Sequence, residues 1–396
     1  GDAPGLAYGS RKWQVSLQDP DSDLHALYIS PTLAWDGTVL VGAGSYLYAY
    51  NPDGRLKWRF KANGRLHDIT GGYFGGLGAV AVGRDETIYF GTMNGILHAV
   101  DKSGNGLWTL NQLSGRIYSS PAIGADGTVY YGHAESPFKL CAVSSNGNLN
   151  WSVNLPSSIL GSPAVDASGR VFAACSSVST PRLFMYDTNG AALTNWTISY
   201  PVAASPVIGR DNWVYIGAGT NLYGFSTTGT QSRVWSFAKQ IHSSPAVDAN
   251  GILYVAVETN LYACNPAGGI LRSWRLSGPS RSSPFLAEDG TIYVNGSNAV
   301  HAFHPSGATN WTFALDPEDE SIYQSQMVAS DGTVYTAGLN FFYALCGRSG
   351  PLSSPWTGYK HDALRTGNAG FDPAVILKPT GLTASQGAFP DRVQVD

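Results

Sequence analysis

Charged residues are scarce in this chain of 396 residues. Asp, Glu, Lys and Arg make up 13 % of it, against about 25 % in an average soluble domain. The formal net charge is −4 and there is no run of Lys or Arg, so neither nucleic acid nor an anionic membrane surface is expected as a partner. No apolar stretch approaches the ~18 residues of a membrane-spanning helix. The composition therefore excludes partners that bind through bulk charge, and it predicts no membrane span.

Cysteine is also sparse, and its spacing excludes the common cysteine sites. The four residues are Cys141, Cys175, Cys264 and Cys346, none of which is adjacent to another or part of a C-x-x-C pair. Each falls at or beside an expected strand, which favours buried free thiols over a disulfide or a metal site. The sequence also lacks G-x-S-x-G, H-E-x-x-H and phosphate-loop motifs, so no common catalytic signature is present.

Glycine, with 47 residues, and aromatic residues, at 12 %, are abundant, as in proteins built of short strands and tight turns. Residues 243–274 contain the unit SSPAVDANGILYVAVETNLYACNPAGGILRSW. It predicts four short antiparallel strands. The first two are joined at Asn250-Gly251, a turn in which we expect φ > 0 at both residues. One such sheet cannot bury both of its faces alone, so the unit needs neighbours.

Two features of this unit recur along the chain at intervals of about 40 residues. The Trp that opens the fourth strand recurs at Trp13, Trp58, Trp108, Trp151, Trp196, Trp235, Trp274 and Trp311. A Ser-Pro pair ahead of the first strand recurs with its serine at positions 30, 120, 162, 205, 244 and 283. A period near 40 with four strands in each unit is typical of propeller blades, and eight units can be counted.

We therefore predict an all-β fold, an eight-bladed β-propeller of four-stranded antiparallel blades. Residues 11–17 resemble a Trp-bearing fourth strand without its first three, and residues 326–346 have three strands without a fourth. The N-terminal strand is expected to join the last blade and close the ring, which removes an exposed sheet edge. Each periodic Trp is expected to wedge between two blades with its N–H hydrogen-bonded. Trp35 and Trp213 fall in turns outside the period and are expected to be exposed.

The propeller is predicted to occupy residues 1–370. Residues 371–396 are expected to form a linker and the truncated start of a fibronectin type III-like domain. A Pro-led strand begins at Pro379, and an alternating Val-Gln-Val run follows it. The parent protein is therefore expected to be longer than this chain.

One face of the predicted ring is the better candidate for a ligand site. The loops that enter the first strands and the turns between second and third strands share this face, and the longer loops occur there. Aligning the eight units places six polar side chains around the mouth of the central channel, where ligands of such folds commonly bind. They are Tyr28, His67, Tyr118, His242, Arg281 and Gln324. These residues offer hydrogen bonding and stacking; the alternative is that they are ordinary half-exposed strand residues.

Two acidic loops enter blades 1 and 8, which a closed ring brings side by side. Their carboxylates are Asp19, Asp21, Asp23, Asp316, Glu318, Asp319 and Glu320. Clustered carboxylates suit Ca²⁺, which takes six to eight oxygen ligands. No EF-hand spacing is present, and acidic loops are commonly only solvated. Ca²⁺ is therefore a candidate ligand here, and no other cofactor is expected.

The repeat resembles that of the pyrroloquinoline quinone (PQQ)-type propellers. Residues 99–108 follow its Ala-x-Asp-x-x-Gly-x-x-x-Trp pattern, and residues 49–58 show it with Asn in place of Asp. Residues 356–367 resemble a segment at one end of related secreted propellers. The resemblance covers residues 11–370 and is specific for the fold, whereas function depends on individual sites.

The resembled family has two branches with different activities. Quinoprotein dehydrogenases hold PQQ with a disulfide between adjacent cysteines and with Ca²⁺. No two cysteines are adjacent here, so PQQ is not expected. The other branch, similar to the barrel-assembly lipoprotein of the bacterial outer membrane, is eight-bladed and acts as a non-enzymatic scaffold.

The resemblance and the missing motifs together predict a non-catalytic binding or scaffold propeller. We expect it to engage a protein or a glycan at the bacterial cell surface through the channel face, as a monomer. Its compartment is expected to be extracellular, at the cell surface or in the periplasm. The alternative is a secreted enzyme, either a degenerate PQQ-dependent dehydrogenase or a hydrolase or lyase of polysaccharides, with the residues at the mouth as catalysts.

Overall fold

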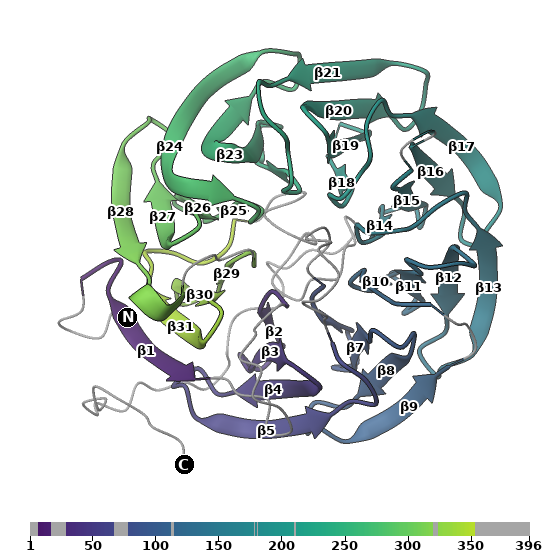
Figure 1. The fold of residues 1–396 in the computed structure, drawn as a ribbon, viewed down its shortest axis with the longest axis horizontal. Helices are drawn as coiled ribbons and strands as arrows, with labels where there is room; N and C mark the ends of the chain where they lie inside the picture. The colour runs from purple at the N-terminus through teal and green to yellow at the C-terminus, as the bar shows by residue number, and fades with distance from the viewer. Residues whose placement is uncertain are drawn as a thin grey trace.

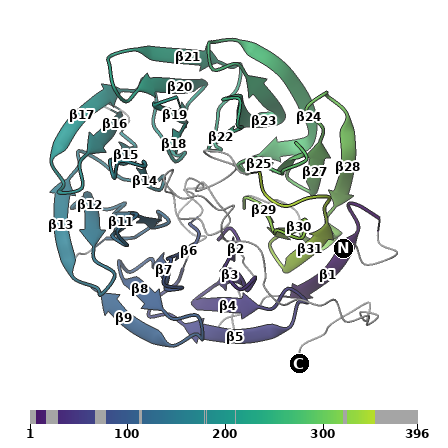
Figure 2. The same ribbon diagram turned by 180° about the vertical axis from the view of Figure 1, so that it is seen from behind.

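The computed structural model describes residues 7–16, 29–66, 78–111, 115–177, 179, 181–209, 211–319 and 324–352. Within these ranges eight antiparallel sheets stand around a central axis (Figure 1), and the view from behind gives the same closed circle (Figure 2). We number the blades 1 to 8 from the sheet that begins with β2. The prediction of an all-β, eight-bladed propeller is confirmed.

Each blade runs from a short first strand beside the channel to a fourth strand at the rim. The first strands are β2 (Thr32–Leu33), β6 (Ala81–Val82), β10 (Ala122–Ile123), β14 (Ala164–Val165), β18 (Val207–Ile208), β22 (Ala246–Val247), β25 (Phe285–Leu286) and β29 (Met327–Val328). The second strands are β3 (Val39–Ala43), β7 (Ile88–Gly91), β11 (Val129–Gly132), β15 (Val171–Cys175), β19 (Trp213–Ala218), the first part of β23 (Leu253–Cys264), β26 (Ile292–Asn295) and β30 (Thr333–Ala337).

The third strands and the fourth strands complete the sheets. The third strands are β4 (Tyr46–Tyr50), β8 (Leu97–Val100), β12 (Lys139–Val143), β16 (Arg182–Tyr186), β20 (Asn221–Ser226), the second part of β23, β27 (Ala299–Phe303) and β31 (Phe341–Cys346). The fourth strands are β5 (Leu56–Lys61), β9 (Gly106–Leu110), β13 (Leu149–Asn154), β17 (Ala192–Thr197), β21 (Ser232–Ser236), β24 (Ile270–Ser280), β28 (Thr309–Ala314) and, for blade 8, β1 (Arg11–Ser16). A single 3-10 turn, η1 (Pro317–Asp319), is the one helical element in the described part of the chain.

Blade 6 departs from the pattern in two ways. β23 runs unbroken through the places of the second and third strands and bends at Glu258, whose φ of 50° lies in the left-handed region. β24 has 11 residues, whereas the fourth strand of blade 5 has five. Its last residues therefore reach from the rim towards the channel (Figure 1), where Ser280 pairs with Glu258.

The N-terminal strand closes the ring, as predicted. β1 pairs antiparallel with β31, with Trp13 opposite Ala344. Lys12 Nζ also donates to Thr333 Oγ1 at 2.6 Å, in the first turn of blade 8. Backbone and side-chain contacts therefore both join the start of the chain to its last blade.

The core lies between the blades, and the periodic Trp side chains fill it at the rim. Trp108 shows the usual arrangement. Its ring packs against Tyr89 of its own blade, with ring centroids 5.8 Å apart. Its other side lies on Gly147 of blade 3, where an added Cβ would come within 2.8 Å of the indole. Its Nε1 donates to Ser145 O at 2.9 Å. The prediction of a wedged, hydrogen-bonded indole is confirmed at this junction.

Other junctions between blades differ from this arrangement. Nε1 of Trp274 and Nε1 of Trp311 are buried and have no hydrogen-bond partner in the described ranges. The prediction that each indole N–H finds an acceptor is therefore wrong for these two. Their rings still pack against tyrosines, as in the pair formed by Trp311 and Tyr293 with centroids 5.6 Å apart.

Two predictions about the first turns are wrong. In the Asn250-Gly251 turn only Gly251 has a positive φ, of 80°, because the turn is a three-residue loop in which only the last position is left-handed. Trp213 is 8 % exposed. The guanidinium carbon of Arg233 lies 3.9 Å from the centroid of the Trp213 ring, so a cation–π contact covers it.

A circle of hydrogen bonds joins the first strands, and we call it the serine belt. In seven of the eight blades the backbone N–H of the residue at this position donates to a serine Oγ of the next blade; the donor is a Ser-Pro serine in five of them, Ala79 in blade 2 and Ser325 in blade 8. The links are Ala79 N to Ser120 Oγ (2.6 Å), Ser120 N to Ser162 Oγ (2.8 Å), Ser162 N to Ser205 Oγ (2.9 Å), Ser205 N to Ser244 Oγ (2.9 Å), Ser244 N to Ser283 Oγ (3.0 Å), Ser283 N to Ser325 Oγ (3.0 Å) and Ser325 N to Ser30 Oγ (3.0 Å). Ser30 N completes the circle by donating to Gly78 O at 3.1 Å. The recurring serine is therefore a structural residue that links neighbouring blades.

Candidate functional site

The loops that enter the first strands lie beside the turns between second and third strands, and together they form what we call the inlet face. Ala134 N donates to Arg116 O at 2.9 Å, and Ile241 N donates to Gly219 O at 2.7 Å. Each bond joins an entering loop to such a turn. The two sets of loops therefore share one face of the ring.

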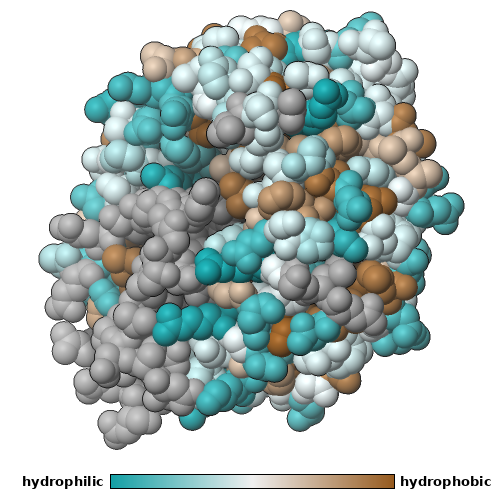
Figure 3. Space-filling model, turned by 45° about the vertical axis from the view of Figure 1, so that its right-hand side comes forward, coloured by the Kyte–Doolittle hydropathy of each residue, from teal (hydrophilic) through white to brown (hydrophobic). Residues whose placement is uncertain are grey.

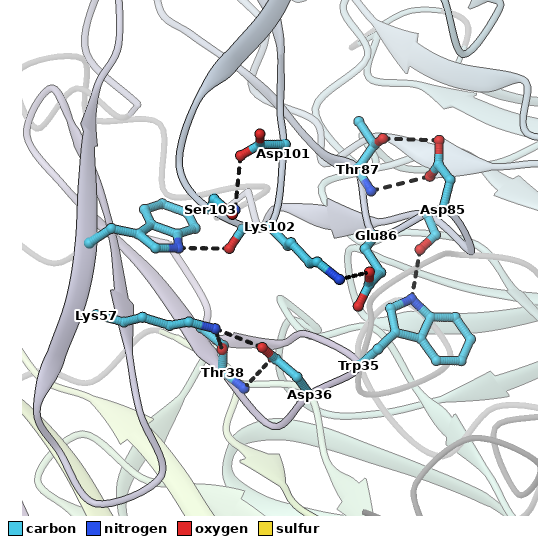
Figure 4. A network of polar contacts seen from close by, with 12 residues as sticks. Trp35, Asp36, Thr38, Lys57, Asp85, Glu86, Thr87, Asp101, Lys102 and Ser103 are labelled. Atoms are coloured by element: carbon cyan, nitrogen blue, oxygen red, sulfur yellow. Dashed lines mark hydrogen bonds and ion pairs between the residues drawn. The ribbon is translucent and has the colours of Figure 1, made fainter.

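The opposite face, which carries the first and third turns of each blade, we call the turn face. Figure 4 shows part of it between blades 1 and 2. Lys57 Nζ donates to Asp36 Oδ2 at 2.7 Å, and Lys102 pairs with Glu86. Trp35 Nε1 donates to Gly83 O at 2.6 Å, which joins the first turns of the two blades. The two ion pairs in this view thus each lie within one blade, whereas the Trp35 indole joins neighbouring blades.

In the described part of the rim, exposed apolar side chains occur at several separate places. On the side of the molecule seen in Figure 3, hydrophobic residues form several small patches among hydrophilic ones. The exposed large apolar residues on fourth strands are spread over several blades. They are Leu56, Leu107, Leu193, Val234, Ile270 and Leu271. The inlet face is therefore the better candidate for a binding site.

Four of the six residues predicted to surround the channel mouth lie in the described ranges, and Tyr28 and His67 lie outside them. His242 and Arg281 are half-buried, Tyr118 is 9 % exposed, and Gln324 has no exposed surface. The four therefore lie at different depths, and their assignment as ligand-binding residues stays a prediction.

Tyr118 belongs to a small apolar cluster on blades 2 to 4. It packs with Ala134 and Leu160, and with the partly buried Met93. Arg116 Nη1 donates to the Tyr118 hydroxyl at 3.0 Å. This side of the mouth is thus an apolar wall with a cation bound to its phenol.

Glu135 completes this group by binding the same arginine. Arg116 Nε lies 3.1 Å from Glu135 Oε1, and both side chains are partly exposed. Neither Arg116 nor Glu135 was among the predicted site residues. Arg116 lies two residues before Tyr118 on the loop that enters blade 3. This spacing is the sequence feature that could have indicated the arginine as a site residue.

His242 lies in a charged group on blades 6 and 7. Its Nε2 is 3.9 Å from Glu258 Oε1. Burial lowers the pKa of His242, the nearby Arg281 lowers it further, and Glu258 acts in the opposite direction. The imidazole is therefore neutral at pH 7, and it lies between an anion and a cation.

The bend in β23 and the long β24 build this charged group. Glu258 is at the bend, and its pairing partner Ser280 directly precedes Arg281. No common sequence signal marks Glu258, because Glu rarely adopts a positive φ. The sequence analysis therefore predicted His242 and Arg281 as site residues but did not predict Glu258.

Gln324 lies below the surface, in a network between blades 7 and 8. Its backbone oxygen accepts a bond from Asn295 Nδ2 at 2.8 Å. Nearby, Gln326 Nε2 donates to Tyr293 O at 2.6 Å, and Ser282 Oγ donates to Gln326 Oε1 at 2.8 Å. These bonds are buried and fix one blade to the next.

In the described part of the acidic loop before blade 8, the carboxylates of Asp316 and Asp319 contact other residues of this chain. Asp316 Oδ2 lies 3.3 Å from Arg11 Nη1. Asp319 is buried, and its carboxylate accepts from the Tyr343 hydroxyl at 2.7 Å and from Asn340 N at 2.5 Å. Burial raises the pKa of Asp319, against the lowering effect of these hydrogen bonds.

The other proposed metal ligands are outside what the structure describes. Asp19, Asp21, Asp23 and Glu320 lie beyond the described ranges, as does the side chain of Glu318. Within those ranges no group of three or more His, Cys, Asp or Glu side chains is placed to hold a metal ion. The calcium site between blades 1 and 8 therefore stays a prediction.

The four cysteines do not fit the quinone site of the dehydrogenases. All four are buried and free, and none is adjacent to another. Burial raises the pKa of Cys141 and that of Cys264 to about 12, so these thiols are unreactive near neutral pH. No step through the quinone is therefore derived for this chain.

Comparison with known proteins gives a family. Residues 5–217 and 218–344 match the family described as "Outer membrane protein assembly factor BamB". No curated protein sequence matches the chain. In the part of the chain that the structure describes, no helix has the length and apolar character needed to cross a membrane.

Solved structures similar to this chain share its fold at low sequence identity. BamB from Moraxella catarrhalis is 16 % identical with a TM-score of 0.65, covering 85 % of this chain and 98 % of its own. A europium-containing methanol dehydrogenase is 12 % identical with a TM-score of 0.68, covering 94 % and 89 %. The C-terminal WD40 domain of Sif2 is 12 % identical with a TM-score of 0.65, covering 85 % and 99 %. These likenesses show the fold alone, because one architecture here carries an assembly factor, an enzyme and a WD40 domain.

Proposed function

The chain belongs to the family of the outer membrane protein assembly factor BamB, and from this premise we propose that it is a non-enzymatic scaffold of the bacterial cell envelope. It binds a segment of another protein at the channel mouth on its inlet face. The family description names an assembly factor for outer membrane proteins, which supports a location in the cell envelope for this chain.

One observation carries the proposal. His242 and Arg281 lie on two loops of the inlet face, Glu258 lies at the bend of β23 beside them, and each of the three is partly exposed. Residues held by loops on a rigid ring are typical of binding sites. Because they offer a neutral imidazole, an anion and a cation together, they suit a ligand that carries both signs of charge.

The opposite wall of the mouth supports a protein ligand. Blade 3 lies across the ring from blade 7 (Figure 1), and it contributes Tyr118 and Ala134 to the apolar cluster that Leu160 of blade 4 completes. A peptide segment supplies apolar side chains for this wall and charged groups for the other. Sites of this kind combine an apolar lining with a few placed polar groups.

The test is a binding experiment with matched charge reversals. The immobilised protein is exposed to a bacterial outer-membrane protein extract in mild detergent, and retained proteins are quantified by mass spectrometry. Arg281→Glu is compared with Arg55→Glu, which reverses a side chain that is 78 % exposed on the turn face. We expect at least one protein to be retained by the wild type and by Arg55→Glu, and to fall about tenfold with Arg281→Glu.

Two results would contradict the proposal. One is the same retained set for all three proteins, and the other is no retained protein for the wild type. Thermal unfolding of each variant shows whether a loss of binding reflects a loss of folding.

A spectroscopic titration addresses the enzymatic alternative. PQQ and Ca²⁺ are added to the protein, and the absorbance of the quinone is followed. We expect no saturable uptake, because no adjacent cysteine pair is present. Stoichiometric uptake together with dye-linked oxidation of an alcohol would overturn the scaffold proposal.

A further inference from the structure

The inlet face of blades 4 and 5 differs in chemistry from the charged group on blades 6 and 7. Residues 155–165, 171–177, 198–209 and 214–226 contain no Asp, Glu, Lys, Arg or His. Two cations border these segments. The Arg182 guanidinium donates to Asn195 Oδ1 on β17, and the exposed Lys239 lies between Phe237 and Ile241, whose N–H groups donate to Thr220 O and Gly219 O. The four segments themselves offer a ligand neutral groups.

Hydroxyl and amide side chains are frequent in this region, which we call the hydroxyl sector. It comprises Ser157, Ser158, Ser176, Ser177, Ser179, Ser199, Tyr200 and Asn221. Its loops are neighbours in space: Ser176 N donates to Ser158 O at 2.8 Å within blade 4, and Ser199 N donates to the Tyr223 hydroxyl of blade 5 at 3.3 Å. The sector is thus one continuous part of the inlet face.

Tyr200 is the exposed aromatic residue of this sector. In the described part of the chain two tyrosines are exposed, Tyr8 at 45 % and Tyr200 at 40 %. The guanidinium of Arg348 lies over the Tyr8 ring, 5.3 Å from its centroid. No aromatic or cationic partner covers the Tyr200 ring among the described residues, so it is available to a ligand.

Tyr200 is held in place by its neighbours. Its side chain lies on Gly219, where an added Cβ would come within 2.4 Å of Tyr200 Cγ. Gly219 is fixed in turn, because its carbonyl accepts from Ile241 N at 2.7 Å and its φ is 54°. Pro201 restricts the backbone of Tyr200. The ring is therefore preorganised, which lowers the entropic cost of binding.

Polar groups of the sector are suited to neutral hydrogen bonding. Asn221, two residues after Gly219, donates from Nδ2 to the Tyr223 hydroxyl at 3.1 Å. Ser177 Oγ lies 3.2 Å from Ser179 Oγ. The Ser157 hydroxyl has no partner among the described residues. Hydroxyl and amide groups of this kind both donate and accept hydrogen bonds.

We propose that the hydroxyl sector binds a neutral saccharide, with the face of Tyr200 under a sugar ring. The apolar C–H face of a sugar packs on an aromatic ring, while its hydroxyl groups exchange hydrogen bonds with Ser and Asn side chains. The segments that form the sector contain no charged side chain to pair with a charged ligand. This site is separate from the channel mouth and does not depend on the proposed protein partner.

The experiment uses defined sugars as probes. Binding of cellohexaose, maltohexaose and laminarihexaose is measured by calorimetry, with an alginate oligosaccharide as the anionic control. We expect at least one neutral hexaose to bind and the anionic oligosaccharide not to bind. Tyr200→Ala should weaken the binding about tenfold, whereas Tyr200→Phe should stay within about threefold because it keeps the ring.

Matched variants separate this site from the mouth and from unfolding. Tyr8→Ala removes the other exposed tyrosine, and Arg281→Glu alters the mouth; both should leave saccharide binding unchanged. Tryptophan fluorescence checks that each variant is folded. The proposal is overturned if no neutral hexaose binds, if Tyr200→Ala binds as the wild type does, or if Arg281→Glu abolishes saccharide binding.

Discussion

Two arcs of the ring use different side chains to join each blade to the third turn of the next blade. In the first arc, from blade 8 through blade 4, the fourth-strand Trp donates to a carbonyl in the third turn of the next blade. The bonds are Trp13 to Pro52 O (2.8 Å), Trp58 to Lys102 O (2.8 Å), Trp108 to Ser145 O (2.9 Å) and Trp151 to Thr188 O (2.8 Å). Each of these rings lies on a glycine of that turn.

In the second arc, from blade 4 through blade 7, an arginine supplies a bond to the turn. Arg170 Nη1 donates to Thr227 O at 3.2 Å, Arg233 donates to Pro266 O, and Arg272 donates to Ser306 O. The indole N–H groups bond less well to the turns there. Trp235 Nε1 lies 3.2 Å from Asn265 O, and Trp274 Nε1 has no partner among the described residues. A regular Trp period therefore does not guarantee a regular contact.

The largest effect should come from filling the glycine that the indole covers. Gly104 has a φ of 86°, and an added Cβ would come within 2.7 Å of the Trp58 ring. Gly104→Ala should lower the free energy of unfolding by about 3 kcal/mol, from backbone strain and overpacking together. Gly269→Ala, in the second arc, has a φ of 91° with nothing within 4 Å, and should cost about 1 kcal/mol. Urea denaturation measures both, and equal losses would show that the two arcs pack alike.

Acid should destabilise both arcs, through two buried histidines on third strands, one in each arc. Burial lowers the pKa of His98 and that of His301 to about 4. The unfolded chain takes up a proton near pH 6.5 and the folded chain does not. Stability is therefore lost as the pH falls from 6.5 to about 4, by about 2–3 kcal/mol for each histidine.

Replacement by phenylalanine separates the two histidines. His98 stacks on Phe90, with centroids 5.1 Å apart, so His98→Phe should remove its share of the acid sensitivity at little cost at pH 7. His301 Nε2 accepts from Ser277 N at 3.1 Å, so His301→Phe should also cost about 1 kcal/mol at pH 7. Unfolding free energies at pH 7 and pH 4.5 test this, and an unchanged pH dependence in both variants would contradict it.

The smallest effect should come from removing the indole N–H itself. Trp58→Phe loses the bond to Lys102 O, whereas Trp274→Phe removes a buried donor that has no partner among the described residues. Both lose some contact area, so Trp58→Phe should cost about 1 kcal/mol more than Trp274→Phe. A larger loss for Trp274→Phe in urea denaturation would mean that its N–H has a partner after all.

The fold was predictable because each blade repeats the same local signals. The periodic Trp and the turn residues set the number of blades, and the lone strand at residues 11–16 indicated the closure. The contact made by each Trp was not predictable. It depends on whether the next turn presents a glycine under the ring, as Gly147 does and Gly268 does not, and that depends on the position of the whole turn.

The candidate site was predictable only in part. Alignment at the first strand indicated His242 and Arg281, because each lies two residues before a Ser-Pro pair. Glu258 escaped because it depends on a left-handed bend that Glu seldom adopts. Tyr200 was not predicted as a site residue, because the exposure of one aromatic side chain leaves no periodic pattern in the sequence. Gln324 was aligned with the mouth, yet the bond from Asn295 holds its backbone in a buried network.

The serine belt has a consequence for how this architecture can change in size. Linear repeat proteins gain or lose a unit at an end, since each unit touches only its neighbours. Here the hydroxyl of Ser30 accepts from Ser325, 295 positions away, so the circle has no end at which a unit could be added. Deletion or duplication of one repeat would leave a backbone N–H and a serine hydroxyl of the belt without hydrogen-bond partners. It would also change the angle between neighbouring blades around the whole ring. Evolution of this protein is therefore expected to proceed through loop exchange on a fixed count of blades.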